Sequence, residues 1–190
     1  MQLNPNDLTA LSSYAYTLSQ LKENELAINY LKQALTIKPD DVNLLGTLGL
    51  IYDSMKMWAE CDSVYERALQ IDSQNALVNN NYAYSLSERG ERLNLALKMA
   101  EIAIAAVPDN TSYLDTIGWV HFKLGNYREA KDYLEKAIEI GGESAVMLEH
   151  LGDIMFKLGN IEKAKSLWQK AYNLDNTNVT LKSKIDKGEI

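Results

Sequence analysis

The sequence predicts an all-α fold, a solenoid of antiparallel helix pairs that stack one after another. The first observation is a period, because small residues recur at steps of 34 residues, with a single step of 35, in three parallel series. The second is a series of residues that start helices, which recurs with the same period. A fixed period of about 20–50 residues is typical of repeat architectures, in which each unit is one supersecondary element.

The small residues define the register of the repeats. One series lies in the first predicted helix of each pair and two lie in the second, where small side chains let helices approach closely. The series are Ala15, Gly49, Ala83, Gly118 and Gly152; Ala27, Cys61, Ala96, Ala130 and Ala164; and Ala34, Ala68, Ala103, Ala137 and Ala171. The extra residue falls between Ala83 and Ala96, so we expect an insertion in the loop of the third repeat.

Helix boundaries repeat as well. Six residues whose side chains accept hydrogen bonds from free backbone amides mark helix starts, namely Asp7, Asp41, Asn75, Asn110, Ser144 and Asn178. Gly90, Gly125 and Gly159 follow three of these caps by 15 residues, where a first helix would end in a left-handed turn. Apolar residues follow helical spacing between these marks, as in Leu11, Leu45, Leu114 and Leu148 and in Leu31, Tyr65, Leu134 and Trp168.

These marks divide the chain into repeats. We expect repeats at residues 8–41, 42–75, 76–110 (with the inserted residue), 111–144 and 145–178, and a closing helix at 179–190 that packs Leu181 and Ile185 on the last repeat. Residues 1–7 align at the 34-residue step with residues 35–41. They therefore predict the tail of a truncated preceding repeat, and a natural chain that continues upstream.

The pattern resembles the tetratricopeptide repeat family. The resemblance is clearest in YLDTIGWVHFKLGNYREAKDYLEKAIEI (113–140) and MLEHLGDIMFKLGNIEKAKSLWQKAYNL (147–174), and covers nearly the whole chain. It implies that the helix pairs wind into a right-handed superhelix. The segments NNYAYSLSERG, YLDTIGWV and EHLGD also resemble the C-terminal part of longer bacterial proteins of this family. Such proteins are often exported or lipid-anchored, so the compartment stays open between export and the cytoplasm.

Composition excludes several functions. The net charge of −7 argues against nucleic acid or an anionic membrane surface as the main partner, since both attract basic patches. No apolar run is long enough for membrane insertion, and the single Cys61 excludes an internal disulfide framework. Cys61 occupies a slot that is alanine in the other repeats, which favours a packed thiol over a nucleophile.

The chain lacks recognisable catalytic patterns. No serine or cysteine has a base and an orienting group at a familiar spacing, and no glycine-rich loop could hold a phosphate. We therefore expect neither an enzyme nor a cofactor. A metal site from Glu149, His150 and Asp153 is conceivable, because Glu149 and Asp153 share a helix face, but the expectation is that none exists.

The resemblance implies that first helices line a concave groove that binds partners. The slots pointing inward predict a partner-binding groove made of Tyr16, Leu50, Asn80, Asn81, Tyr84, Asp115, Trp119, Phe122, Glu149, Asp153 and Phe156. Exposed aromatics aligned along a groove are a partner-site signal, so we expect its centre at Tyr84 and Trp119, which share one slot. Asp115 and Glu149 would favour a lysine or arginine on the partner. Trp168 is instead predicted to lie in the core.

The run Asn79-Asn80-Asn81 is unusual inside a helix, because asparagine is a poor helix former. Asn80 and Asn81 occupy inward slots, where an amide can bind the backbone of an extended peptide. Asn79 stands where other repeats have leucine, so we expect it to satisfy a buried backbone group near the lengthened loop. The alternative is that helix starts simply tolerate asparagine.

The predicted function is a protein–protein interaction scaffold that binds a peptide or helix of a partner protein in its concave groove. One alternative is a structural spacer or self-association module, in which the chain's own terminal helix or a copy of it covers the groove aromatics. Another is a non-catalytic accessory domain of an enzyme. The family's clamp for C-terminal carboxylates is not expected, because its slots hold the uncharged Ser12, Tyr16, Thr47, Leu77 and Asn81.

Overall fold

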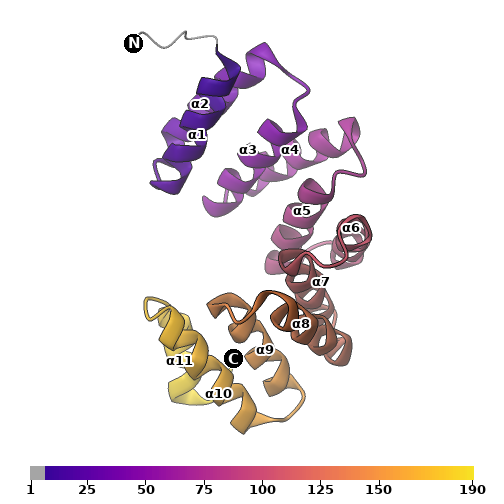
Figure 1. Ribbon diagram of the computed structural model, residues 1–190, viewed down its shortest axis with the longest axis vertical. Helices are drawn as coiled ribbons and strands as arrows, with labels where there is room; N and C mark the ends of the chain where they lie inside the picture. The colour runs from indigo at the N-terminus through magenta and orange to yellow at the C-terminus, as the bar shows by residue number, and fades with distance from the viewer. Residues whose placement is uncertain (1–6) are drawn as a thin grey trace. The chain divides into compact units, whose positions relative to one another are not determined.

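Helices form every regular element between residues 7 and 190, the part of the chain that the computed structural model describes (Figure 1). Their bounds are α1 (Leu8–Gln20), α2 (Asn24–Ile37), α3 (Val42–Ser54), α4 (Trp58–Ile71), α5 (Ala76–Arg89), α6 (Leu93–Ala106), α7 (Thr111–Lys123), α8 (Tyr127–Gly141), α9 (Ala145–Lys157), α10 (Ile161–Leu174) and α11 (Val179–Lys187). The predicted all-α class is thus confirmed for these residues. The expected lead-in at residues 1–7 lies outside them, except for Asp7.

The six predicted helix caps are confirmed. The Asp7 carboxylate accepts the backbone amides of Thr9 and Ala10, and Asp41, Asn75, Asn110, Ser144 and Asn178 each accept at least one amide of the helix that follows. Each side chain replaces one of the hydrogen bonds that the first turn of a helix cannot make internally. The starts of α1, α3, α5, α7, α9 and α11 therefore follow from local sequence.

The turn after each first helix requires a left-handed residue. Gly90, Gly125 and Gly159 adopt φ of 68°, 84° and 82° there, and Lys22 and Lys56 take the same conformation in the first two repeats. The inserted residue of the third repeat lies after Gly90, where Arg92 is also left-handed at φ 47°. The predicted loop insertion is therefore accommodated by a second left-handed residue just before α6 begins.

The helices form two compact units, which are described separately. The N-terminal unit ends at Ser85 and the C-terminal unit begins at Leu86, so that α5 contributes to both. In the N-terminal unit, α1 packs on α2 and α3 packs on α4. Tyr65 and Tyr82 are both fully buried there, and their rings stack with centroids 5.2 Å apart.

The core of the C-terminal unit gathers around Trp168 of α10. Leu134, Leu148 and Ile154 belong to the same buried cluster as this side chain, and all of them are nearly inaccessible to solvent. Helix α11 adds the buried Leu181 and the partly buried Ile185 to the same cluster. The last helix of the chain therefore shares the core of the α9–α10 pair.

Three glycines of first helices lie where no side chain fits. An added Cβ would come within 2.5 Å of the Tyr65 ring at Gly49, 2.2 Å of Leu134 at Gly118 and 2.5 Å of the Trp168 indole at Gly152. The close helix contacts that the sequence predicts at Gly118 and Gly152 are thus confirmed.

We expect Gly152→Ala to lower the free energy of unfolding by about 1–3 kcal/mol, because the fully buried Trp168 ring cannot move away from the new methyl group. Urea denaturation followed by circular dichroism measures the change. The matched control is Gly46→Ala, whose Cβ would lie 3.3 Å from a terminal methyl of Val78 and which gains helix propensity. Equal stability of both variants would contradict the packing described here.

Candidate functional site

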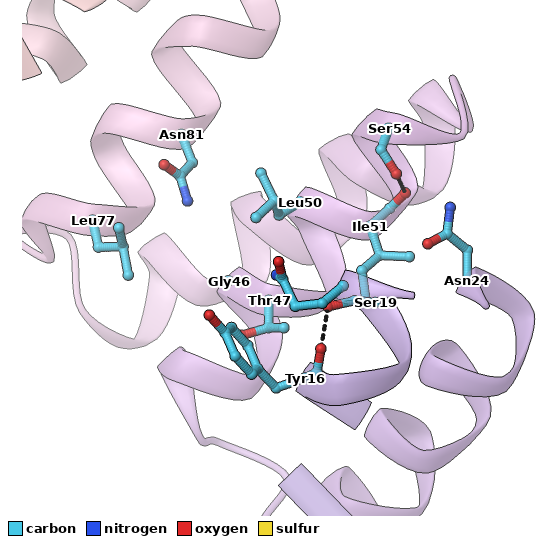
Figure 2. A pocket seen from close by; sticks show the side chains of 11 residues that line it. Tyr16, Ser19, Asn24, Gly46, Thr47, Leu50, Ile51, Ser54, Leu77 and Asn81 are labelled. Carbon is cyan, nitrogen blue, oxygen red and sulfur yellow. Dashed lines mark hydrogen bonds between the residues drawn. The ribbon is translucent and has the colours of Figure 1, made fainter. Parts of the chain in front are cut away.

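The N-terminal unit carries a hollow along its first helices (Figure 2). Tyr16 of α1, Leu50 of α3 and Leu77 of α5 contribute its apolar surface, and the volume is about 350 Å³. These three side chains are 61%, 53% and 49% exposed, respectively. The structure thus brings together Tyr16, Leu50 and Asn81 of the predicted groove in one concave surface, and we call this surface the N-terminal hollow.

The lining of the N-terminal hollow is uncharged. Its remaining residues are Ser19, Gln20, Asn24, Gly46, Thr47, Ile51, Ser54 and Asn81. The hydroxyls of Ser19, Thr47 and Ser54 donate to carbonyls of their own helices at 2.7–2.9 Å, so their lone pairs remain as acceptors. Thr47 and Leu77 also line the hollow, although they were not among the predicted groove residues; both occupy slots of the family's carboxylate clamp.

The three consecutive asparagines have different environments. Asn79 is buried and donates to the carbonyls of Ser73 and Asn75 at 3.0 and 2.9 Å. It therefore satisfies backbone groups as predicted, but at the turn between α4 and α5. The expected place near the lengthened loop is wrong, because the two carbonyls that accept from Asn79 lie just before the start of α5.

Asn80 and Asn81 also differ from each other in burial and in hydrogen bonding. The Asn80 amide donates to Oδ1 of Asn81 at 3.2 Å, while its own Oδ1 accepts no hydrogen bond from the residues described. Asn80 is buried, so its predicted exposure to a groove is wrong, whereas the half-buried Asn81 lines the N-terminal hollow. Its Oδ1 is engaged by Asn80, which orients the Asn81 amide group.

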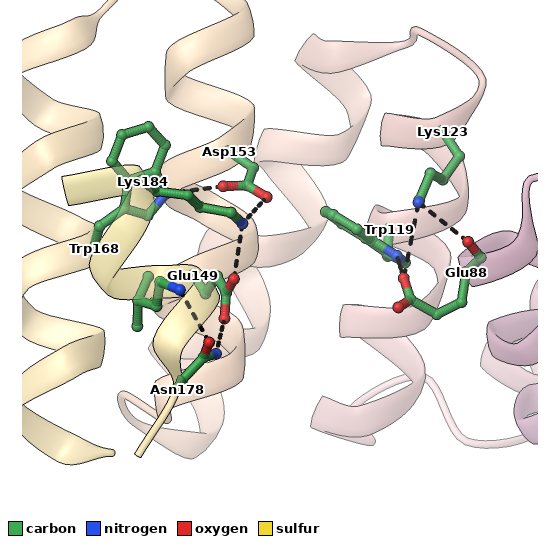
Figure 3. Close-up of polar contacts among 9 residues, drawn as sticks. Glu88, Trp119, Lys123, Glu149, Asp153, Trp168, Asn178 and Lys184 are labelled. Atoms are coloured by element: carbon green, nitrogen blue, oxygen red, sulfur yellow. Dashed lines mark hydrogen bonds and ion pairs between the residues drawn. The ribbon is translucent and has the colours of Figure 1, made fainter. Parts of the chain in front are cut away.

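Trp119 does not project from the C-terminal unit as an exposed aromatic. It is only 6% exposed, because its indole stacks on His150 at a centroid distance of 4.0 Å and on Phe122 at 4.6 Å. Its Nε1 donates to Glu88 at 2.5 Å, and the Lys123 ammonium lies 5.0 Å from the ring centroid (Figure 3). The expectation of an exposed Trp119 is wrong, since neighbouring side chains already cover it.

Asp115 is likewise engaged within the unit. Its carboxylate lies 2.8 Å from Nδ1 of His150, and both side chains are buried. A partner lysine would find no free carboxylate here, which corrects the role expected of Asp115. The half-buried Tyr84 belongs to the N-terminal unit and Trp119 to the C-terminal unit, so their pairing across a groove stays a prediction.

Glu149 and Asp153 of α9 hold a lysine of the last helix (Figure 3). The Lys184 ammonium donates to Glu149 at 2.7 Å and to Asp153 at 2.6 Å. Asn178 donates to the other oxygen of Glu149 at 2.9 Å, and the Trp168 indole donates to the other oxygen of Asp153 at 2.9 Å. Asp153 is 4% exposed, so the prediction that it faces an open groove is wrong.

Burial and mutual attraction act in opposite directions on the pKa of each charged group in this ion pair. It raises the pKa of Asp153, despite the opposing attraction of Lys184 and the hydrogen bonds from Lys184 and Trp168. Burial also disfavours the charged form of Lys184, but attraction to Asp153 and hydrogen bonds to both carboxylates outweigh it and raise the pKa of this lysine. The carboxylates therefore favour the charged form of Lys184, and removing one partner would leave the other with an uncompensated charge in a mostly buried place.

The alternative of a metal site at Glu149, His150 and Asp153 finds no support in the geometry. His150 faces Asp115, whereas the two carboxylates face Lys184. Among residues 7–190, no group of three histidine, cysteine or acidic side chains converges as metal ligands would. Phe122 and Phe156, which complete the predicted groove, are half-buried and pack against the core around Trp168.

Cys61 is fully buried in α4 of the N-terminal unit, which agrees with a packed thiol. Its sulfur lies 3.8 Å from the Ser85 hydroxyl, and the nearby Asp53 accepts a hydrogen bond from that hydroxyl.

In the described part of the chain, no helix is long and apolar enough to cross a membrane.

Comparisons with known proteins point to one family. A tetratricopeptide repeat family model matches residues 8–41 and 42–75, and the model for anaphase-promoting complex, cyclosome, subunit 3 matches residues 90–173. The TPR repeat-containing protein PA4667 of Pseudomonas aeruginosa is 26% identical over 125 residues, which make up 66% of this chain and 21% of that protein. The chain thus spans about a fifth of the length of the first curated relatives it matches.

Solved structures share the fold. PilW, a widely conserved type IV pilus biogenesis factor, superposes with a TM-score of 0.82 at 20% identity, covering 95% of this chain and 85% of that one. YrrB, described as a TPR protein with an unusual peptide-binding site, gives a TM-score of 0.65 at 21% identity over 97% of this chain and 94% of its own. At these identities the likeness concerns the fold alone.

Proposed function

Because the chain is a tetratricopeptide repeat protein, we propose that it is a protein-interaction scaffold whose N-terminal hollow binds a segment of a partner protein. Proteins of this fold are generally interaction scaffolds and are typically non-catalytic. We propose the same for this chain, with a protein or peptide as its partner and with neither catalysis nor nucleic-acid binding as its role.

The proposal rests on one observation: the exposed side chains of Tyr16, Leu50 and Leu77, from three successive first helices, line the same hollow. Apolar side chains are costly to leave in water when they lie together, and a hollow lets one partner side chain cover all three. YrrB is a protein of the same fold whose description includes a peptide-binding site, which supports a peptide as the ligand class.

The uncharged lining determines the kind of segment that fits. A partner side chain that enters the N-terminal hollow loses water without gaining an ion pair, so an aliphatic or aromatic anchor is favoured over a charged one. The hydroxyl lone pairs and the Asn81 amide offer hydrogen bonds to the partner's backbone. We therefore propose an apolar anchor on an otherwise polar backbone, with binding that depends little on salt.

We expect Leu50→Asp to abolish this binding while the fold survives, because Leu50 is half exposed and its replacement adds a charge to the hollow. A random peptide library displayed on phage and selected on the full chain supplies the probe. Peptides selected in this way should bind the variant at least about 30-fold more weakly, which corresponds to about 2 kcal/mol.

The matched control is Leu26→Asp. Leu26 of α2 is 49% exposed but does not line the N-terminal hollow. Fluorescence polarisation should give this variant the affinity of the unaltered chain. Selected peptides that bind Leu50→Asp as tightly as Leu26→Asp would refute the hollow as the binding site.

A second candidate, the structural spacer, draws support from the C-terminal unit. There the chain's own terminal helix engages Glu149 and Asp153, two residues of the predicted groove. The spacer alternative expected such coverage at the groove aromatics. Coverage by α11 is therefore a property of the C-terminal unit, while the N-terminal hollow has exposed side chains available to a partner.

A further inference from the structure

The terminal helix is basic, whereas the chain is acidic. Helix α11 has the sequence VTLKSKIDK, with three lysines and one aspartate, in a chain whose net charge is −7. Of these lysines, Lys184 faces inward onto α9, whereas Lys182 is exposed to solvent. Of the three lysine charges, that of Lys184 is therefore the one directed at the last helix pair.

Glu149 and Asp153 of α9 together bind the ammonium group of Lys184 in a largely buried position. The side chains of Lys184, Glu149 and Asp153 are only 14%, 19% and 6% exposed. The Lys184 ammonium lies 2.7 Å from a carboxylate oxygen of Glu149 and 2.6 Å from one of Asp153. Asn178 and the Trp168 indole occupy further acceptor positions of the two carboxylates. An ordinary surface ion pair is exposed and has no such support, so this arrangement is a built receptor for a lysine head group.

An apolar socket lies one turn away. Leu181, three residues before Lys184, is buried in the cluster around Trp168, and Ile185 packs partly against it. A helix that presents an apolar residue and then a lysine three positions later fills both socket and receptor, since residues three apart lie on one helix face. The surface therefore selects a helix that carries both an apolar residue and, three positions later, a lysine.

Helix α11 is a short occupant. It has nine residues, and helices of that length are only marginally stable without tertiary contacts. Its docking therefore rests on Leu181, Ile185, Lys184 and Asn178, and it can leave as one unit while α9 and α10 stay folded. When it leaves, Glu149 and Asp153 lose the ammonium group that both bind, so the vacated surface favours a lysine-bearing replacement.

We propose that α9 and α10 form a docking site for a helix of a partner protein that carries an apolar residue followed three positions later by lysine. Helix α11 occupies this site in cis and is an internal competitor that the partner helix displaces. The proposal concerns the C-terminal unit and does not depend on the N-terminal hollow.

The test uses a fluorescent peptide of residues 174–190 as the probe and the full chain carrying Leu181→Asp, which weakens the internal competitor and leaves Glu149 and Asp153 intact. The peptide should bind this variant at least ten-fold more tightly than the unaltered chain, because the site is no longer occupied at high effective concentration. A K184M peptide should lose at least ten-fold in affinity. A K182M peptide, with the same change of charge at an exposed position, should lose less than three-fold.

Several results would overturn the proposal. Equal losses with K184M and K182M would reduce the effect to general charge attraction, and absence of binding to a folded Leu181→Asp chain would remove the site. A dimer of the unaltered chain in sedimentation that Leu181→Asp abolishes would assign the surface to a second copy.

If Leu181→Asp fails to fold, the unaltered chain takes its place with excess nitroxide-labelled peptide. Displacement of α11 should then broaden the Trp168 indole N–H resonance, and the labelled K184M peptide should leave it sharp. A resonance that stays sharp with both peptides would contradict displacement.

Discussion

Trp168→Ala is expected to lower the free energy of unfolding by about 3–5 kcal/mol. Trp168 is the largest fully buried side chain of the C-terminal unit, and Gly152 packs directly against its ring. The substitution opens a cavity among Leu134, Leu148 and Ile154. It also removes the indole donor of the buried Asp153 carboxylate. Urea denaturation followed by far-ultraviolet circular dichroism measures the loss.

Trp168→Phe separates the two contributions. Phenylalanine fills most of the cavity but cannot donate to Asp153, so this variant should lose about 1–3 kcal/mol, the cost of an unsatisfied buried acceptor. A loss below about 1 kcal/mol for Trp168→Ala would mean that the core of the C-terminal unit does not centre on this residue.

Trp119→Ala is also expected to cost about 3–5 kcal/mol of stability. Its indole is covered by Phe122 and His150 and donates to Glu88, so the substitution removes a packed ring, while the half-exposed Glu88 keeps its ion pair with Lys123. This outcome is the reverse of the sequence-based expectation, in which Trp119 anchors a partner and contributes little to the core.

The control for Trp119→Ala is Tyr16→Ala, because Tyr16 occupies the corresponding slot in α1 and is 61% exposed. Its stability should stay within about 0.5 kcal/mol of the unaltered chain, while binding of the selected peptides weakens. A Trp119→Ala chain with unchanged melting and lost peptide binding would restore Trp119 as a partner anchor.

The fold could be predicted from the sequence because its determinants are local and periodic. A cap such as Asp41 or Asn110 acts within its own first turn, and the left-handed turn at Gly125 depends on one residue. Glycines such as Gly152 mark close helix contacts within a repeat. Repetition of the same signals along the chain made each of them more certain than a single occurrence would be.

The binding surface was predicted less well, because a slot in a repeat determines the direction of a side chain but not whether neighbouring side chains bury it. Tyr16, Leu50, Trp119 and Asp153 share one slot, yet they are 61%, 53%, 6% and 4% exposed. What differs is the neighbouring element, because the third repeat supplies Glu88 to Trp119 and the closing helix α11 supplies Lys184 to Asp153. Both pairs are 31 residues apart, so complementary polar residues at that spacing are the signal in the sequence that could have indicated the burial of these two side chains.

Asn79 illustrates the same limit on a smaller scale. Its polar side chain in a leucine slot predicted a buried backbone partner correctly, since a buried amide must be satisfied. Which backbone it would reach depended on the turn between α4 and α5, and no residue pattern in the sequence marked those two carbonyls as its acceptors.

The central proposal is that partner segments bind in the N-terminal hollow. The most direct measurement is isotope-filtered nuclear Overhauser spectroscopy on the labelled chain with an unlabelled selected peptide. Contacts from the peptide's apolar anchor to the methyl groups of Leu50 and Leu77 and to the Tyr16 ring are the result this account predicts. Contacts confined to the methyl groups of Leu26 or Ile71, which lie on second helices outside the hollow, would contradict it.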